Sequence, residues 1–255
     1  MHSSYSALAA RTVYAYALKG VNPNSQTLTV LTWNVHGCIG RDGKLDVDRV
    51  ARVLGSSDAD VIGLQEVDCR KRLPSGETQL ARLAAITGLE AIAGPTRREG
   101  DGYFGNALLT RHAVGNVAYV DVTVAGREPR GILHVTLHIG DAEVELFNTH
   151  FGLKISERRQ QVERLVEVAE EARAATVIVL GDFNEWRSRA AALSQLKAAF
   201  GKTPAVRSFP SGFPIFALDR VWVRPRSALG QVRALVNGLT RVASDHLPVY
   251  AHVEL

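Results

Sequence analysis

Five short segments, far apart in the chain, each carry carboxylate, amide or imidazole side chains at the point where an apolar run ends. Each apolar run is typical of a buried strand, which places the polar groups at strand ends. Strand ends at one edge of a sheet can converge and hold a hard cation. Five unrelated side chains that merely cap loop backbones would explain this pattern poorly, because Ser, Gly or water satisfies the hydrogen bonds of a loop backbone more simply. The segments are TWNVHG (32–37), LQEVD (64–68), NTHFGL (148–153), GDFNE (181–185) and SDHLPV (244–249).

The pattern along the chain alternates between strand and helix and predicts an α/β fold, with two mixed sheets packed face to face and helices outside. Three consecutive strands in the middle of the chain predict an antiparallel meander. We expect strands over 28–33, 59–66, 105–111, 116–124, 131–140, 142–150, 176–184, 216–223, 231–237 and 247–255. We expect helices over 47–54, 78–88 closed by Gly88, 157–175 capped by Ser156, and 188–200.

Length and charge limit the classes of function. The chain has 255 residues, 46% of them hydrophobic, which is enough for one large core and predicts a single domain over 28–255. Its net charge of +4 suits an anionic substrate but is too mild to establish nucleic-acid binding. Two cysteines, Cys38 and Cys69, follow strand-like segments, so either two reduced thiols or a pairing between them fits.

The first 27 residues lack the basic start and continuous apolar centre of a secretory signal, and no later segment is apolar enough to span a membrane. We expect residues 1–27 to form an arm or a short amphipathic helix of unknown role. The sequence therefore favours a cytoplasmic protein without a transmembrane segment, and we expect a monomer.

Each polar residue also has a plain structural interpretation when it is taken alone. Glu66 fits an exposed acid at a strand end, GDFN fits a turn in which the Asp side chain caps the backbone, and His150 or His246 fits a hydrogen-bonded structural histidine. Their joint occurrence favours a site over five separate accidents.

The ordered set WN, QE, TH, GDFN and SDH resembles the endonuclease/exonuclease/phosphatase superfamily, the DNase I-like metal-dependent phosphoesterases. The resemblance covers residues 28–255 and implies a four-layer α/β sandwich, two packed mixed β-sheets flanked by helices. The superfamily includes DNase I-like nucleases, abasic-site endonucleases, neutral sphingomyelinases and inositol polyphosphate phosphatases. The implied cofactor is Mg²⁺, with Mn²⁺ as a possible substitute.

The resemblance implies a metal ligand at Glu66. It places the amide of Asn34 beside the metal and its bound phosphate, and Asp245 on the metal side of His246. Carboxylate and amide oxygens with water suit Mg²⁺, whereas no Cys and His spacing in the chain suggests zinc.

The resemblance also implies the catalytic residues. His150 matches the histidine that stabilises the transition-state phosphate or helps to protonate the leaving group. Asp182 and Asn184 look like the pair that orients the attacking water and a phosphate oxygen. His246 resembles the general base, and Asp219 the carboxylate that orients it. An imidazole near its usual pKa can take the proton from water.

Basic residues are candidates for substrate contact. Arg127 and Arg130 precede a strand where DNase I-like enzymes place a phosphate-facing arginine, although a solvated pair at a hairpin turn fits equally well. Lys154, Arg158 and Arg159 fit either the rim of the site or an ordinary charged first turn of a helix.

The sequence thus predicts a Mg²⁺-dependent hydrolase of phosphoric esters, foremost a phosphodiesterase acting on a small phosphodiester, a lipid head group or nucleic acid. His36 stands where abasic-site endonucleases carry an acid, which argues against that activity. A DNase I-like nuclease is the alternative within the same chemistry. A non-catalytic binding protein on the same fold is the alternative from another class.

Overall fold

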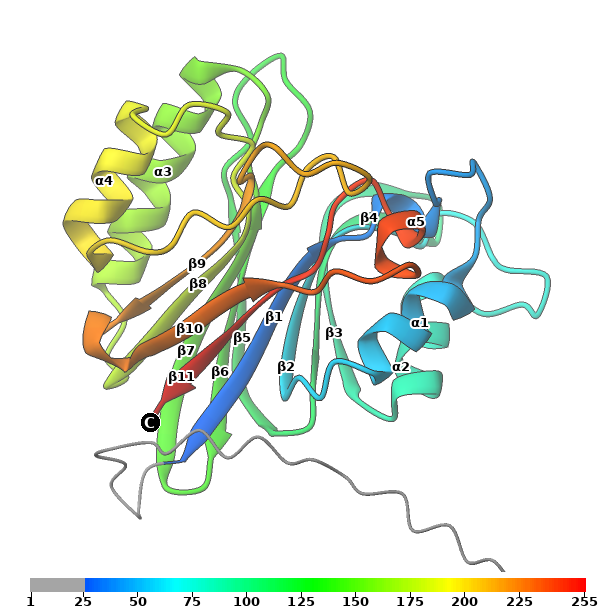
Figure 1. The fold of residues 1–255 in the computed structure, drawn as a ribbon, viewed down its shortest axis with the longest axis horizontal. Helices are drawn as coiled ribbons and strands as arrows, with labels where there is room; N and C mark the ends of the chain where they lie inside the picture. The colour runs from blue at the N-terminus through cyan, green and yellow to red at the C-terminus, as the bar shows by residue number, and fades with distance from the viewer. Residues whose placement is uncertain (1–25) are drawn as a thin grey trace, which may run out of the picture.

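The computed structural model describes residues 26–255, which form two β-sheets packed face to face with helices on both outer faces (Figure 1). One sheet contains β1 (Thr27–Asn34), β2 (Val61–Asp68), β3 (Glu90–Glu99), β4 (Gly102–Thr110), β10 (Leu229–Ala234) and β11 (Val249–Glu254), in the order β10-β11-β1-β2-β4-β3. The other contains β5 (Ala113–Asp121), β6 (Gly131–Ile139), β7 (Ala142–His150), β8 (Thr176–Asp182) and β9 (Asp219–Arg224), in sequence order. The predicted four-layer sandwich of two mixed sheets is confirmed.

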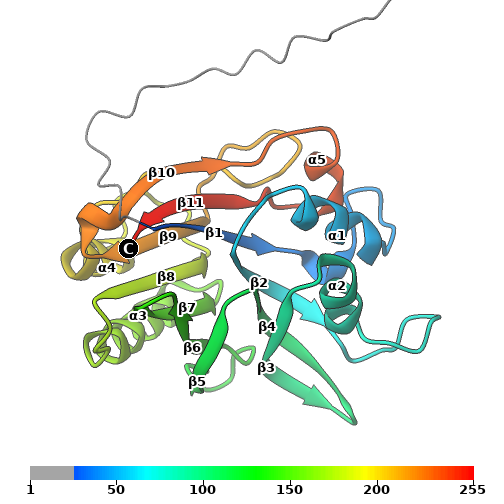
Figure 2. The same cartoon turned by 90° about the horizontal axis from the view of Figure 1, so that it is seen from below.

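The helices cover the two outer faces of the sandwich, one pair on each side (Figure 2). The helical elements are η1 (His36–Cys38), α1 (Val47–Gly55), α2 (Gln79–Thr87), α3 (Ile155–Glu170), α4 (Ala191–Phe200), η2 (Arg226–Ala228) and α5 (Thr240–Ala243). Among the described helices, none combines the length and the apolar character needed to cross a bilayer.

Alternation along the strands builds three apolar layers. Successive residues of a strand point to opposite faces, so Val30 packs between the sheets while Leu31 packs under α1 and α2. Likewise Leu146 lies between the sheets and Phe147 lies under α3 and α4. Strands that are apolar on both faces are therefore buried on both faces, which explains the continuous apolar runs in the sequence.

A buried polar bridge joins the two sheets. Gln65 on β2 donates from Nε2 to Asn148 Oδ1 on β7 at 2.7 Å and to Thr32 Oγ1 on β1 at 3.1 Å. Asn148 in turn donates to the backbone carbonyls of Leu64 and Ala107 on the opposite sheet. Because unpaired amides are costly between two apolar layers, these bonds fix how the sheets register against each other.

Several predicted boundaries are wrong for identifiable reasons. Ser156 does not cap α3; Lys154 is the N-cap residue, and the Glu157 side chain accepts its backbone N–H at 2.9 Å. The helix ends at Glu170 rather than at residue 175, and α4 begins at Ala191 rather than at 188. Strand β8 ends at Asp182 rather than at residue 184, and Asn184 itself is in the left-handed region with φ 48°.

The edge strand β3 is absent from the sequence-based expectation. Its sequence contains Gly94 and Pro95 and ends in charged residues, all of which favour a turn. Proline is tolerated there because β3 lies at the edge of its sheet, where one side of the strand needs no donor.

Other expectations hold. Gly88 ends α2 in the left-handed conformation with φ 70°, and β5, β6 and β7 form the antiparallel meander. Cys38 and Cys69 are buried free thiols packed in one apolar cluster. The predicted N-terminal arm lies outside the described residues except for Gln26 and Thr27.

Gly63 tests the packing between the sheets. A Cβ there would overlap Leu180 Cδ1 and contact the Asn148 amide, so Gly63→Ala should lower the free energy of unfolding by roughly 1–3 kcal/mol. The matched control is Gly55→Ala at the end of α1, where a Cβ meets open space and the loss of backbone freedom in the unfolded chain should stabilise by about 0.5–1 kcal/mol. Urea denaturation measures both, and equal effects of the two substitutions would contradict this packing.

Candidate active site

Strand direction brings the predicted site residues to one edge of the sandwich. β1 runs parallel to β2, and β7 runs parallel to β8, so Asn34, Glu66, His150 and Asp182 all lie at carboxyl ends or just before them. β9 is antiparallel to β8 and starts at Asp219, which pairs in register with Asp182.

β11 is antiparallel to β1, so the segment before it, which carries Asp245 and His246, reaches the same edge. Both sheets thus contribute to one cleft of about 320 Å³. Its lining includes Asn34, Glu66, Arg130, His150, Asp182, Asn184, Asp245 and His246.

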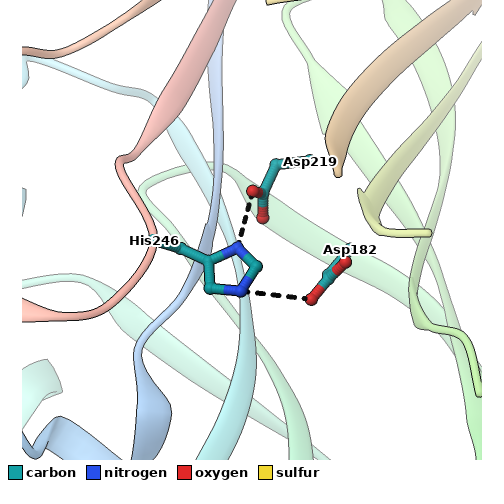
Figure 3. Close-up of side chains that lie close together, drawn as sticks. All are labelled: Asp182, Asp219 and His246. Carbon is teal, nitrogen blue, oxygen red and sulfur yellow. Dashed lines mark hydrogen bonds and ion pairs between the residues drawn. The ribbon is translucent and has the colours of Figure 1, made fainter. Parts of the chain in front are cut away.

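His246 lies between two buried carboxylates (Figure 3). Its Nδ1 is 2.8 Å from Asp219 Oδ2, and its Nε2 is 3.7 Å from Asp182 Oδ2. Phe209 lies against the ring, with centroids 4.8 Å apart. The Asp219 contact sets the tautomer and the orientation of the imidazole, leaving Nε2 directed towards Asp182 and the cleft.

The charges in this group shift two pKa values. Burial disfavours the imidazolium, but the Asp219 and Asp182 carboxylates outweigh that effect and raise the pKa of His246 to about 10. Burial, together with the neighbouring Asp219 carboxylate, raises the pKa of Asp182 to about 6 although His246 opposes the shift. The imidazolium therefore neutralises part of an acid-rich site.

Asn34 sits between two carboxylates. Its Nδ2 donates to Glu66 Oε1 at 2.9 Å and to Asp182 Oδ2 at 3.1 Å, while the backbone N–H of His36 donates to its Oδ1. In this orientation the amide presents donors to the site rather than an oxygen ligand. It holds the Glu66 and Asp182 side chains towards each other.

The backbone turns sharply where Glu66 lies. A register shift between Leu64 and Val67 forms a bulge in β2, and Glu66 has φ 57°, in the left-handed region. Non-glycine residues occupy that region at a cost of about 1–3 kcal/mol, and such strain clusters at functional sites. The bulge directs the Glu66 carboxylate into the cleft, where a quarter of the side chain is exposed.

His150 and Asn184 contact each other. Asn184 Nδ2 donates to the Phe151 carbonyl at 2.9 Å and lies 3.0 Å from His150 Nε2, which acts as the acceptor in this arrangement. Burial, with the nearby charges of Arg130 and His246, lowers the pKa of His150 well below its usual range. His150 Nε2 faces Asp182 Oδ2 at 3.5 Å and Glu66 Oε1 at 3.9 Å.

The two predicted arginines differ in position. Arg130 is buried, lines the cleft, donates to Glu128 at 2.8 Å and keeps a buried Nε without a partner among the described residues. Arg127 is exposed and is not part of the cleft lining. Of the pair, Arg130 is the one that can reach a bound anion.

The donor set of the cleft fits a hard divalent cation. Glu66 and Asp182 oxygens both lie within 4 Å of His150 Nε2, and the partly exposed Asp245 carboxylate lines the same cleft. Asp182, Asp219 and His246 also present ligand atoms within 4.8 Å of one another, but Asp219 already accepts the His246 hydrogen bond. The carboxylate oxygens of Glu66, Asp182 and Asp245 are the kind of ligand that Mg²⁺ and Mn²⁺ prefer.

The fold of these elements is shared with known proteins. The sequence model of the Endonuclease/Exonuclease/phosphatase family matches residues 31–246. The chain belongs to this family. Its members are generally phosphoesterases or nucleases and typically depend on a divalent metal.

A curated relative is the uncharacterized protein YbhP of Escherichia coli (strain K12), 34% identical over 165 residues. The match covers 61% of this chain and 64% of YbhP, so the chain spans less than two thirds of the length of this relative.

Solved structures of the family share the fold at lower identity. The family protein from Bacteroides thetaiotaomicron has a TM-score of 0.74 at 16% identity, covering 91% of this chain and 98% of that one. The Beutenbergia cavernae protein has a TM-score of 0.69 at 22% identity, covering 90% and 72%. D. rerio TDP2 complexed with single strand DNA product has a TM-score of 0.65 at 20% identity, covering 89% and 98%.

An ion pair next to the site was not predicted from the sequence. Arg158 is buried, unlike an ordinary charged first turn, and its Nε donates to Glu185 Oε2 at 2.9 Å. Its Nη1 also donates to the Leu153 carbonyl at 2.6 Å. Arg158 thereby ties the segment after His150 to the segment after Asn184. Glu185, the last residue of GDFNE, was the sequence signal for this ion pair. Its partner Arg158 lies 27 residues earlier in the chain, so the sequence alone does not connect the two.

Lys154 and Arg159, the other two basic residues considered for the rim, are both exposed.

Arg158→Lys should lower the free energy of unfolding by roughly 1–3 kcal/mol, because one ammonium cannot replace the planar group that bonds Glu185 and the Leu153 carbonyl together. Arg159→Lys, at the next and exposed position, is the matched control and should change it by less than about 0.5 kcal/mol. Urea denaturation of both variants checks the role, and equal stability of the two would refute it.

The Asp219 contact predicts a pH dependence of stability in metal-free protein. Because the pKa of His246 rises from 6.5 to about 10 on folding, its stabilisation is complete below pH 6.5 and is lost as pH rises towards 10. Asp219→Asn removes the nearest carboxylate, so the decline in unfolding free energy over that range should be smaller.

Urea denaturation in EDTA between those pH values tests this expectation. Glu143→Gln, in an exposed pair with His138, is the control and should leave the slope unchanged. A slope in Asp219→Asn equal to that of the unsubstituted protein would contradict the assigned contact.

Proposed function

We propose that this protein is a Mg²⁺-dependent phosphodiesterase in which His246 activates water for in-line attack on phosphorus. The observation that carries the proposal is the buried Asp219–His246 contact at 2.8 Å, which directs Nε2 into a cleft lined by carboxylates and by Arg130. Such an arrangement brings together a base, a carboxylate that stabilises the protonated base, and groups that bind an anion.

The metal ligands in this proposal are Glu66 and Asp245, with Asn34 beside them. When bound, Mg²⁺, or Mn²⁺ in its place, polarises the phosphate and neutralises charge on its non-bridging oxygens. A positive charge near the carboxylates also opposes the upward shift of the His246 pKa, which brings the imidazole closer to the range of a general base.

The protein's own groups divide the remaining work. His246 Nε2 accepts the proton from water, and Asp219 holds the ring and stabilises the imidazolium that results. Asp182 and Asn184 orient the water and a phosphate oxygen, and His150 lies beside the transferred phosphate.

Arg130 contributes a buried positive charge for the phosphate anion, with Nε free of protein partners among residues 26–255. In this proposal Arg127 does not contact the substrate, because it is exposed and lies outside the lining of the cleft. Guanidinium groups bind phosphate oxygens well because their donors are planar and fixed.

Nuclease activity is the second candidate, favoured by a basic groove beside the cleft. The groove of about 470 Å³ is lined by Arg70, Lys71, Arg72 and Arg97 among others. Arg70 lies 5.2 Å from the ring centroid of Phe104, which also lines the catalytic cleft. Asp68 and Glu99 in the same groove pair with Arg70, however, and reduce its positive potential.

Glu66→Ala and His246→Ala should each lower kcat for bis-p-nitrophenyl phosphate with Mg²⁺ by about 100-fold or more, since each removes a group required at the reacting phosphate. Glu143→Ala and His138→Ala are the matched controls, because both residues are half exposed and lie away from the cleft. Undiminished turnover in both site variants, with folding intact by circular dichroism, would reject the proposal.

Parallel assays separate the two candidates. Degradation of single-stranded and duplex DNA and RNA is compared with hydrolysis of phosphodiesters that lack a base. Isothermal titration of Mg²⁺ into the protein and into Glu66→Ala reports metal binding without turnover. Metal binding with no hydrolysis of any ester would favour a binding protein instead.

A further inference from the structure

Three segments border the cleft, and we call residues 151–156, 186–189 and 207–218 the cleft rim. Leu153, Trp186, Phe209 and Leu218 of these segments line the cleft itself. Trp186 packs edge-on against Phe209 and Phe216, with centroids 5.5 and 4.8 Å apart. The rim is therefore a packed structure that adjoins the candidate catalytic residues.

The cleft rim exposes large apolar side chains. Five of the twelve exposed large hydrophobic residues of the described chain lie on it, and Phe213 is the most exposed of all at 78%. Scattered exposed apolar residues are normal, but a group of them around a cleft marks an interaction site. The five are Leu153, Ile155, Trp186, Phe213 and Ile215.

The charges of the cleft rim have one sign. Lys154, Arg187, Arg189 and Arg207 are exposed, and the three segments contain no aspartate or glutamate. An apolar surface whose own charged side chains are all cationic is complementary to an anionic surface with an apolar interior.

The rim is fixed to the catalytic residues. Ser211 Oγ donates to the Ser244 carbonyl at 2.7 Å, and the Ser211 N–H donates to the Asp245 carbonyl at 2.7 Å. Arg241 Nη1 donates to the Gly212 carbonyl. Segment 207–218, which carries Phe213 and Ile215, therefore keeps a set position relative to His246.

We propose that the cleft rim docks on an anionic lipid bilayer, and that the substrates are phosphate esters held at that surface. The second part rests on the proposed function. Leu153, Ile155 and Ile215 cannot stack on nucleobases, whereas they can enter the interface of a bilayer, so the composition of the rim favours lipid over a single-stranded nucleic acid.

Binding is measured with the full chain by flotation on vesicles of phosphatidylcholine alone or with phosphatidylglycerol. The protein should bind the anionic vesicles more tightly. The double variant Phe213→Ser, Ile215→Ser should weaken that binding by about 10-fold or more, because it removes apolar area from the interface. Ile86→Ser, Val117→Ser alters two exposed apolar residues away from the rim and should bind as the unsubstituted protein does.

The charge component is tested separately. Arg187→Glu, Arg189→Glu should abolish the preference for anionic vesicles, whereas Arg52→Glu, an exposed change on α1, should keep it. Equal binding to both kinds of vesicle, or equal loss in the control variants, overturns the proposal. Tighter binding of single-stranded DNA that the rim variants weaken overturns it in favour of a nucleic-acid surface.

Hydrolysis of bis-p-nitrophenyl phosphate separates docking from catalysis. The rim variants should keep turnover of this water-soluble ester, because Phe213, Ile215, Arg187 and Arg189 do not line the cleft. Vesicle binding without hydrolysis of any ester would leave docking standing and remove the proposed function. Hydrolysis of the ester without vesicle binding would support the proposed function and overturn docking on a bilayer.

Discussion

Unbalanced negative charge at one edge of the sandwich is the constraint on which the rest of the site depends. Glu66, Asp182, Asp219 and Asp245 contribute carboxylates there, and His246 lies between Asp182 and Asp219, which raise the pKa of its imidazole. Asn34 adds donors between Glu66 and Asp182. Such a cluster is stable only with positive charge nearby, which His246 and Arg130 supply in part and a divalent cation would complete.

The backbone must hold these groups against their mutual repulsion. The left-handed residue Glu66 and the bulge around it turn one carboxylate inward. The Gln65–Asn148 bridge fixes one sheet against the other directly behind the site, since Gln65 precedes Glu66 and Asn148 lies two residues before His150. Polar residues within the segments that carry the candidate site thus also hold the two sheets together.

Much of the fold and the site follows from the sequence, for physical reasons that also set the limits. Continuous apolar runs predict strands that are buried on both faces, and Gly88 marks the end of its helix through its backbone freedom. The polar groups at the strand ends predict the cleft, because parallel strands bring such ends together. The catalytic and metal-binding roles of these residues stay predictions.

Features set by tertiary contacts could not be predicted. Arg158 reads as an exposed residue of a first turn, and only the folded chain brings it to Glu185. The start of α3 is misjudged because Ser156 resembles a cap while Glu157 satisfies the backbone from inside the helix. The edge position that tolerates Pro95 in β3 is likewise a property of the whole sheet.

The division of the site between two sheets has a consequence for cooperativity. Asn34, Glu66 and His246 come from one half of the sandwich, and His150, Asp182 and Asp219 come from the other. Neither half assembles the candidate site by itself, so a partly folded chain with only one ordered sheet would lack the site. The complete candidate site and the native interface between the two sheets should therefore form and be lost together.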